Sequence, residues 1–171
     1  MLPFRFSTLF ALLLAFVALP LAGCDSSDDG DSGDDAAGCP TANQASGTFT
    51  ANAGGSTFDA VCIQVITDGG VFNITGIENV GQTGNSNQEF LSISITNAAT
   101  GQYSPPFGAI VAYSRNQNAS TDPNNTYAGL SGTVNLTEFT AGSAKGTFTV
   151  TVQNNNQDQI QISSGSFDVT F

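Results

Sequence analysis

The sequence predicts an all-β domain over residues 39–171, an antiparallel β-sandwich with a β-barrel as second choice. Three observations predict this class. From Cys39 onward, apolar β-formers alternate with Thr, Asn, Gln and Ser. Clusters of Gly, Asn, Asp and Pro interrupt this alternation about every 8–12 residues, as turns do. No stretch shows helical periodicity, and no fixed-period repeat indicates a solenoid or propeller.

The first four expected strands are each bounded by turn-forming residues. The turns lie at 52–55 and 68–70, and a Gly-, Asn- and Gln-rich loop runs to Gln88. In the third strand Phe72 and Ile74 share one face, and the fourth strand alternates apolar residues with Ser and Thr. The expected ranges are 48–51, 57–66, 71–78 and 91–96.

The second half of the domain repeats this pattern after the break at Pro105–Pro106. The polar stretch 116–125 reads as a loop, and 141–142 and 154–158 as turns. The expected strands are 109–114, a short strand from Tyr127, 133–137, 147–152 and 160–171, which gives eight or nine strands in all.

The last strand changes phase along its length. Ile160 and Ile162 are even-numbered, whereas Phe167, Val169 and Phe171 are odd-numbered. A straight strand would place the two sets on opposite faces. A β-bulge near Gly165 would restore the inward phase, so a bulge is predicted there.

Residues 1–23 have the features of a secretory signal peptide. Arg5 lies in the first region, and an apolar run of about a dozen residues follows, which is shorter than the roughly 20 residues of a membrane-spanning helix. The run ends in Leu21, Ala22, Gly23 and Cys24, which resembles the lipobox of bacterial lipoproteins. The resemblance implies cleavage before Cys24, acyl chains such as palmitate on Cys24, and attachment to a membrane of the cell envelope. An uncleaved N-terminal anchor is the alternative.

Residues 24–38 are expected to form a lipidated, disordered acidic tether. Six of the fourteen residues from 25 to 38 are Asp, and apart from Ala none is apolar. One interpretation is a plain spacer. Another is an export tag for surface-exposed lipoproteins, although Asp25 next to the lipidated Cys resembles an inner-membrane retention signal. A calcium loop is a weaker alternative because a closing Glu is missing.

Three Cys residues are present, and lipidation of Cys24 leaves two. In an exported protein an even pair predicts a disulfide, here between Cys39 and Cys62. Two free thiols are the alternative.

Composition argues against several classes of function. The chain has 171 residues, a net charge of −11 and three cations, too few to neutralise a nucleic-acid backbone. It has no His, which removes the commonest acid–base group and transition-metal ligand, and no cofactor, metal or catalytic residue is expected. Its acid excess is also typical of proteins adapted to salt.

Four aromatic residues flank the Pro105–Pro106 break. Core packing is the simpler interpretation, and an exposed platform that stacks sugars is the functional one. The outward row at Thr147, Thr149 and Thr151 could hold ordered water or ice, but β-propensity explains it more simply. The candidate ligand-binding residues are therefore Tyr103, Phe107, Tyr113 and Tyr127.

Several short motifs resemble a family of small bacterial lipoproteins whose globular domain has no assigned function. They begin with 47–51 and 58–60, continue at 127–132 and end with 146–148 and 162–169. The resemblance covers roughly residues 45–171 and implies a β-sandwich, with no site residues to transfer.

Three functional hypotheses follow. The first is an extracytoplasmic binding or adhesion module on the outer membrane, acting on an extracellular polymer or envelope protein through loops 79–88, 98–107 and 116–125. The second is a structural subunit of an envelope assembly that pairs through a strand edge. The third is a glycan-active enzyme with paired carboxylates.

Overall fold

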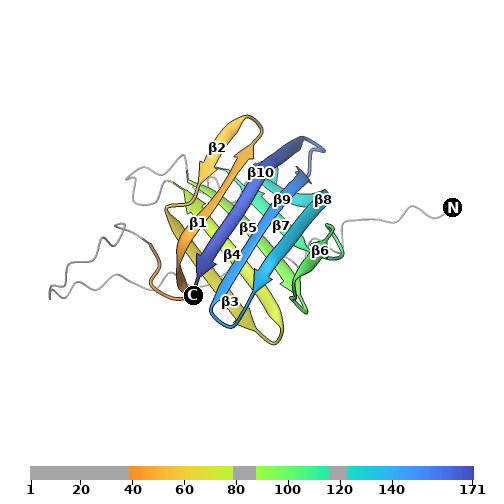
Figure 1. Cartoon of the computed structure of the whole chain (residues 1–171). Helices are drawn as coiled ribbons and strands as arrows, with labels where there is room; N and C mark the ends of the chain where they lie inside the picture. The colour runs from red at the N-terminus through yellow and green to blue at the C-terminus, as the bar shows by residue number, and fades with distance from the viewer. Residues whose placement is uncertain (1–38, 79–87, 116–122) are drawn as a thin grey trace, which may run out of the picture. The chain divides into compact units, whose positions relative to one another are not determined.

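Eight antiparallel strands close on themselves in the computed structural model, which describes residues 39–78, 88–115 and 123–171. Around the ring the order is β1, β3, β4, β5, β7, β8, β9 and β10 (Figure 1). Each of these strands therefore lies beside the ring strands that come before and after it in the chain, while β2 pairs with β1 and β6 with β8. The strands are β1 Gln44–Ala53, β2 Ser56–Asp59, β3 Cys62–Asp68, β4 Val71–Glu78, β5 Glu89–Thr96, β6 Gly101–Tyr103, β7 Ile110–Ser114, β8 Thr126–Phe139, β9 Ser143–Gln153 and β10 Gln159–Thr170. A 3-10 turn, Pro123–Asn125, precedes β8.

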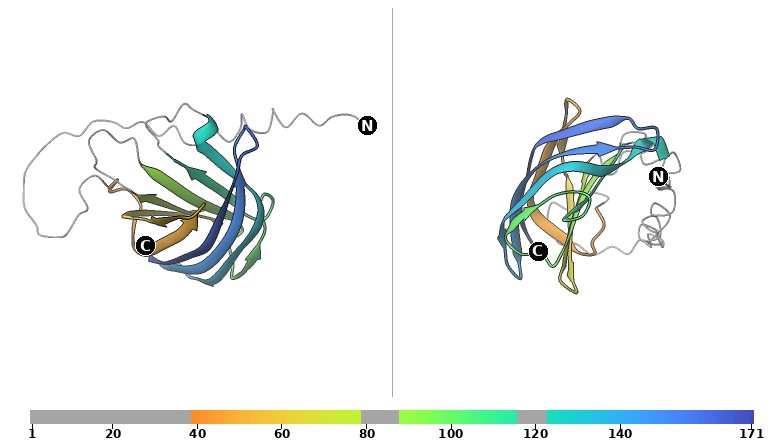
Figure 2. Two further views of the ribbon diagram at one scale, coloured as in Figure 1. Left: turned by 90° about the horizontal axis from the view of Figure 1, so that it is seen from above. Right: turned by 90° about the vertical axis from the view of Figure 1, so that its right-hand side faces the viewer.

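The two ends of the sheet meet at β1. This strand pairs with β10 from Ser46 opposite Thr170 to Ala53 opposite Ile162, and both views of Figure 2 show the two strands side by side. On its other edge β1 makes two pairs with β3 and then pairs with β2. The all-β antiparallel class is therefore confirmed, but as the barrel and not as the first-choice sandwich. Sandwich and barrel strands have the same period-2 pattern in sequence. The pairing of β1 with β10, which closes the sheet, is what distinguishes the barrel here.

Most expected strands form, with three differences. The range 71–78 is confirmed residue for residue as β4. The long strand expected over 57–66 is divided into β2 and β3 by Ala60 and Val61. The two pieces expected at Tyr127 and 133–137 are one strand, β8, and the expected loop 98–107 contains the short strand β6.

The predicted bulge in the last strand is confirmed. Ile162 lies opposite Val150 and Gly165 opposite Phe148, so β10 has one residue more than β9 between these pairs. Ser164 adopts a φ of 51° within this bulge. Ile162 and Phe167 consequently both point into the core, where each is buried.

Phenylalanine rings fill much of the barrel interior. The Phe49 ring makes edge contacts with Phe58, Phe148 and Phe167 at centroid distances of 5.9, 5.8 and 6.2 Å. Phe167 in turn contacts Phe72 at 6.0 Å, which continues the stack along the barrel. An eight-stranded barrel is just wide enough for such side chains, so its described interior is a packed core.

Three inward-facing glycines make room for these rings. A Cβ on Gly76 would lie 2.6 Å from the Phe49 ring, and one on Gly146 would overlap Phe167. Gly165 has the same relationship to Phe148. Alternating small and large residues in this way is how small barrels fit aromatic rings inside.

The structure brings Cys39 and Cys62 together as a disulfide, with their Cα atoms 5.6 Å apart, as the cysteine count predicts. Two hydrogen bonds continue the attachment of this segment to β3. Gln64 Nε2 donates to the Ala42 carbonyl at 2.9 Å, and the Val65 amide donates to the Asn43 carbonyl at 2.9 Å. The start of the domain is therefore fixed to β3 at the seam between β1 and β3. The signal peptide, the lipobox with Cys24 and the acidic tether lie outside the described residues.

Candidate functional site

A band of uncharged polar side chains crosses the outside of the barrel. Five neighbouring strands, β6, β8, β9, β10 and β1, each contribute one residue to a row that runs across the sheet. Each residue of the row lies directly opposite the next in the strand pairing. In order, the row is Gln102, Asn135, Thr147, Ser166 and Thr50. The last two are joined by a 3.2 Å hydrogen bond between their hydroxyls. Because opposed residues share a face of the sheet, all five side chains point outward.

A second row runs beside the first. Thr133 lies opposite Thr149, and Ser163 lies opposite Asn52 on β1. The bulge in β10 adds the exposed Ser164 between these pairs. We call the two rows together the outer polar face, which consists of Thr50, Asn52, Gln102, Thr133, Asn135, Thr147, Thr149, Ser163, Ser164 and Ser166.

The outer polar face is hollowed over β8, β9 and β10. The hollow has a volume of about 430 Å³. Gly165 and Phe148, which lie opposite each other on β10 and β9, are among the residues that line it. The lining residues are Gln102, Thr133, Asn135, Thr147, Phe148, Thr149, Ser164, Gly165 and Ser166.

The lining of this hollow contains no ionisable group. Along β9 and β10 the nearest charges are Lys145 and Asp168, one outward position beyond Thr147 and Ser166. Across the strands, the exposed Asp59 on β2 lies opposite Thr50, at the end of the first row. Lys145 Nζ and Asp168 Oδ2 are 3.0 Å apart, and this hydrogen bond raises the pKa of Lys145. The opposite charges of Lys145 and Asp168 therefore cancel. In a chain with a net charge of −11, the face is neutral and rich in groups that both donate and accept hydrogen bonds.

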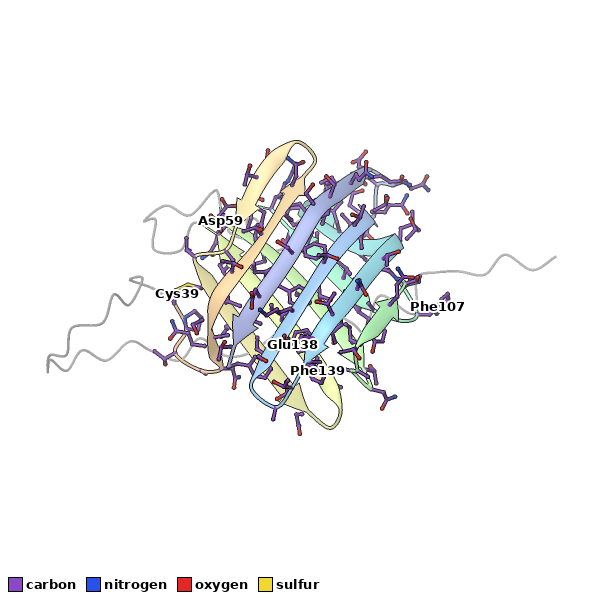
Figure 3. All side chains as sticks on the ribbon, viewed as in Figure 1. Cys39, Asp59, Phe107, Glu138 and Phe139 are labelled. Carbon is purple, nitrogen blue, oxygen red and sulfur yellow. A yellow bond between two sulfur atoms is a disulfide. The ribbon has the colours of Figure 1, made fainter. Side chains whose placement is uncertain are left out.

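The four aromatic candidates do not form one platform. Tyr113 is buried, and its ring centroid lies 6.1 Å from that of the partly buried Tyr127. The Tyr103 hydroxyl donates to the Ala99 carbonyl at 2.7 Å and accepts from the Ala99 amide at 2.9 Å, so it closes a turn. Phe107 is fully exposed and lies on the opposite side of the barrel from Cys39 (Figure 3).

Arg115 closes one end of the barrel. Its Nη2 donates to the Ala53 carbonyl of β1 at 3.1 Å, although β7 and β1 lie on opposite sides of the ring. Its Nε donates to the Tyr113 hydroxyl at 2.9 Å, and this hydroxyl donates to Glu89 Oε2 at 2.5 Å. Burial raises the pKa of Tyr113, which therefore stays a neutral donor. These groups satisfy one another, which is the pattern of a structural network.

Glu89, which belongs to this network, also lies opposite a second carboxylate. Glu78 on β4 pairs with Glu89 on β5. Burial raises the pKa of Glu78, and the charges of Glu89 and Asp59 add to the increase. In the described part of the chain, no three Asp, Glu or Cys side chains are grouped so that they could hold a metal ion.

Comparison with known protein families, characterised proteins and solved structures finds no match. The functional assignment therefore depends on the residues of this chain alone. Within the described residues there is no helix long and apolar enough to cross a membrane.

Sequence reasoning found only part of the outer polar face. The alternation at Thr147, Thr149 and Thr151 is visible in the sequence, but Gln102, Asn135 and the Ser residues of β10 join it only through strand register. Of the loops expected to recognise a ligand, 79–87 and 116–122 lie outside the described residues, and loop 98–107 contains β6.

Proposed function

We propose that this protein is a lipid-anchored lipoprotein of the bacterial cell envelope whose barrel is a non-catalytic binding module. The ligand class is an uncharged, hydroxyl-rich polymer, such as a neutral polysaccharide, and the recognition surface is the outer polar face. Acyl chains on Cys24 and the acidic tether would hold the domain at the outer membrane. The observation that carries the proposal is the neutral, hydroxyl- and amide-lined hollow on an otherwise acidic protein.

The chemistry of the face suits such a ligand. Thr and Ser hydroxyls both donate and accept hydrogen bonds, as sugar hydroxyls do, and the amides of Gln102 and Asn135 add fixed donors and acceptors. Acidic polymers would be repelled by the net charge, whereas a neutral polymer would not. The filled interior favours an outer surface as the recognition site.

Closure of the barrel weighs against the strand-edge hypothesis. The eight strands of the ring have neighbours on both sides, and the shortest pairings are β1–β3 with two residue pairs and β7–β8 with three. Among the described strands only β2 and β6 lie outside the ring, with four and three residues. Edges this short offer little backbone for pairing with another protein.

A charge placed in the hollow tests the proposal. Thr149→Glu in the full-length lipidated protein should weaken binding to a neutral polysaccharide at least tenfold, because the bound polymer would cover the carboxylate and remove its hydration. The matched control is Thr96→Glu, at an exposed outward position of β5 outside the face, which should bind as the wild type does. Equal binding by the two variants would show that the outer polar face does not bind the polymer.

A further inference from the structure

A tight turn presents Phe107 fully to solvent. The turn is closed by the Gly108 amide, which donates to the Ser104 carbonyl at 2.8 Å. Pro105 is buried beneath it, whereas Phe107 is 99% exposed. The apolar ring is thus held outside the core by an ordered turn, and such rings commonly serve as contact anchors.

Two further apolar side chains are exposed on the strands that follow this turn, β7 and β8. Ile110 and Leu130 are each 45% exposed. Ile110 lies on β7 and Leu130 on the neighbouring strand β8, just beyond the last pair of these strands, Ala112 opposite Ala128. Gly129, the residue before Leu130, lies close to the turn, because a Cβ added to Gly129 would be 3.1 Å from Pro105 Cβ.

A bulge directs Leu130 outward. Gly129 pairs with Val152 and Ser131 with Thr151, so Leu130 is the extra residue of β8 at this point. We call Phe107, Ile110 and Leu130 the apolar tip. None of the three is ionisable, although the chain as a whole is strongly acidic.

The area of the apolar tip limits what can cover it. A Phe side chain offers about 150–250 Å² of contact area, and two half-exposed aliphatic side chains add less than that again. A stable interface between two proteins needs about 800 Å² from each partner. The tip is therefore too small to hold a dimer together. It is large enough to contact a surface to which the chain is already attached, because attachment raises the local concentration of the tip at that surface.

We infer that the apolar tip inserts into the bilayer that carries the lipidated Cys24, so that the barrel rests on the membrane in a fixed orientation. This inference rests on the lipid anchor of the proposed function. The fourteen residues between Cys24 and Cys39 span at most about 46–50 Å when extended, at about 3.3–3.6 Å per residue. Phe107 lies on the side of the barrel opposite Cys39, so the tether must extend past the barrel for the tip to meet the membrane (Figure 3). Carboxylates would be repelled by anionic headgroups, and the tip has none.

The absence of Trp from the chain permits a direct test. Full-length lipidated protein carrying Phe107→Trp is reconstituted in phosphatidylcholine vesicles whose acyl chains are brominated. The control is Ile66→Trp, on the exposed surface of β3, where the wild-type side chain is 44% exposed. Neither substitution disturbs the core. Flotation of the vesicles first measures how much protein they carry.

Brominated chains should quench the indole emission of the Phe107→Trp variant about twofold or more relative to that of the Ile66→Trp variant, because apolar groups at an interface enter the acyl region. Floating protein with equal quenching in the two variants would overturn the inference and leave the anchor intact. Protein that does not float with the vesicles would instead overturn the anchor, and the inference with it.

Discussion

Gly165 on β10 lies directly opposite Phe148 on β9, and the Phe148 ring occupies the space where a side chain of Gly165 would stand. Gly165→Ala should therefore lower the free energy of unfolding by about 1–3 kcal/mol, the usual cost of overpacking a core. The control is Gly142→Ala, where the nearest atom to an added Cβ is 3.5 Å away, and a change within about 0.5 kcal/mol is expected. Urea unfolding of both variants measures the difference. Equal stabilities would show that the ring and the glycine are not coupled.

Phe49 and Phe107 form a second matched pair. Phe49 is buried among three other rings, and Phe107 is fully exposed. Phe49→Ala should cost about 3–5 kcal/mol because it leaves a cavity in the core. Phe107→Ala should change the stability by less than about 0.5 kcal/mol. Thermal and urea unfolding measure both values, and a large loss for Phe107→Ala would mean that its ring packs against the barrel.

The disulfide between Cys39 and Cys62 should stabilise the domain by about 3 kcal/mol. It closes a loop with a sequence separation of 23, which restricts the unfolded chain. Reduction of the wild type and the double substitution Cys39→Ala with Cys62→Ala should lower the urea midpoint to a similar degree. The double variant should not respond to reductant, and a response would point to another thiol.

Glu78 should make the stability depend on pH. Its pKa is raised in the folded state by burial and by the charges of Glu89 and Asp59. A raised carboxyl pKa favours the protonated form, so this contribution to stability is present at low pH and lost as the pH rises through the folded pKa.

Glu78→Gln should accordingly be more stable than the wild type at neutral pH by about 0.2–1 kcal/mol, the range for like charges opposite each other in a sheet. The advantage should vanish once the pH falls below the ordinary pKa of a glutamate side chain, about 4.3. Thr67→Ser, at the opposite end of the β3–β4 hairpin, changes no ionisable group and is the control, so its pH dependence should match that of the wild type. A gain that is the same at all pH values would assign the effect to something other than charge.

Lipidation should depend on Cys24 alone. Cells fed a labelled palmitate analogue should label the wild type and the Cys39→Ala variant but not Cys24→Ser. The reason is that Cys24 follows Leu21, Ala22 and Gly23, the lipobox residues. Label on Cys24→Ser would exclude the proposed anchor.

The sequence predicts the strands better than it predicts how they close. Alternation at Phe72 and Ile74 is local, and β4 has the expected bounds. The phase change between Ile162 and Phe167 is also local, and the bulge follows from it. Pairing of β1 with β10 joins residues more than a hundred positions apart, and no local pattern distinguishes it from a sandwich edge.

The same distinction applies to the candidate site. The alternation of β9 in the sequence predicts that Thr147 and Thr149 point outward. That Asn135 and Ser166 lie next to Thr147 depends on the pairing register between strands, which the sequence does not reveal. Tyr113 could have been assigned to the core, because it shares the parity of the buried Val111. Its closeness in sequence to other aromatic residues favoured a platform that does not form.

Binding isotherms test the central claim most directly. Full-length lipidated protein is titrated with a neutral and with an acidic polysaccharide, each at low and at high salt. The neutral outer polar face predicts saturable binding of the neutral polymer with a Kd that salt leaves unchanged within about twofold, and no binding of the acidic polymer at low salt. Binding of the acidic polymer alone, or an affinity for the neutral polymer that collapses in salt, would contradict recognition by the uncharged face.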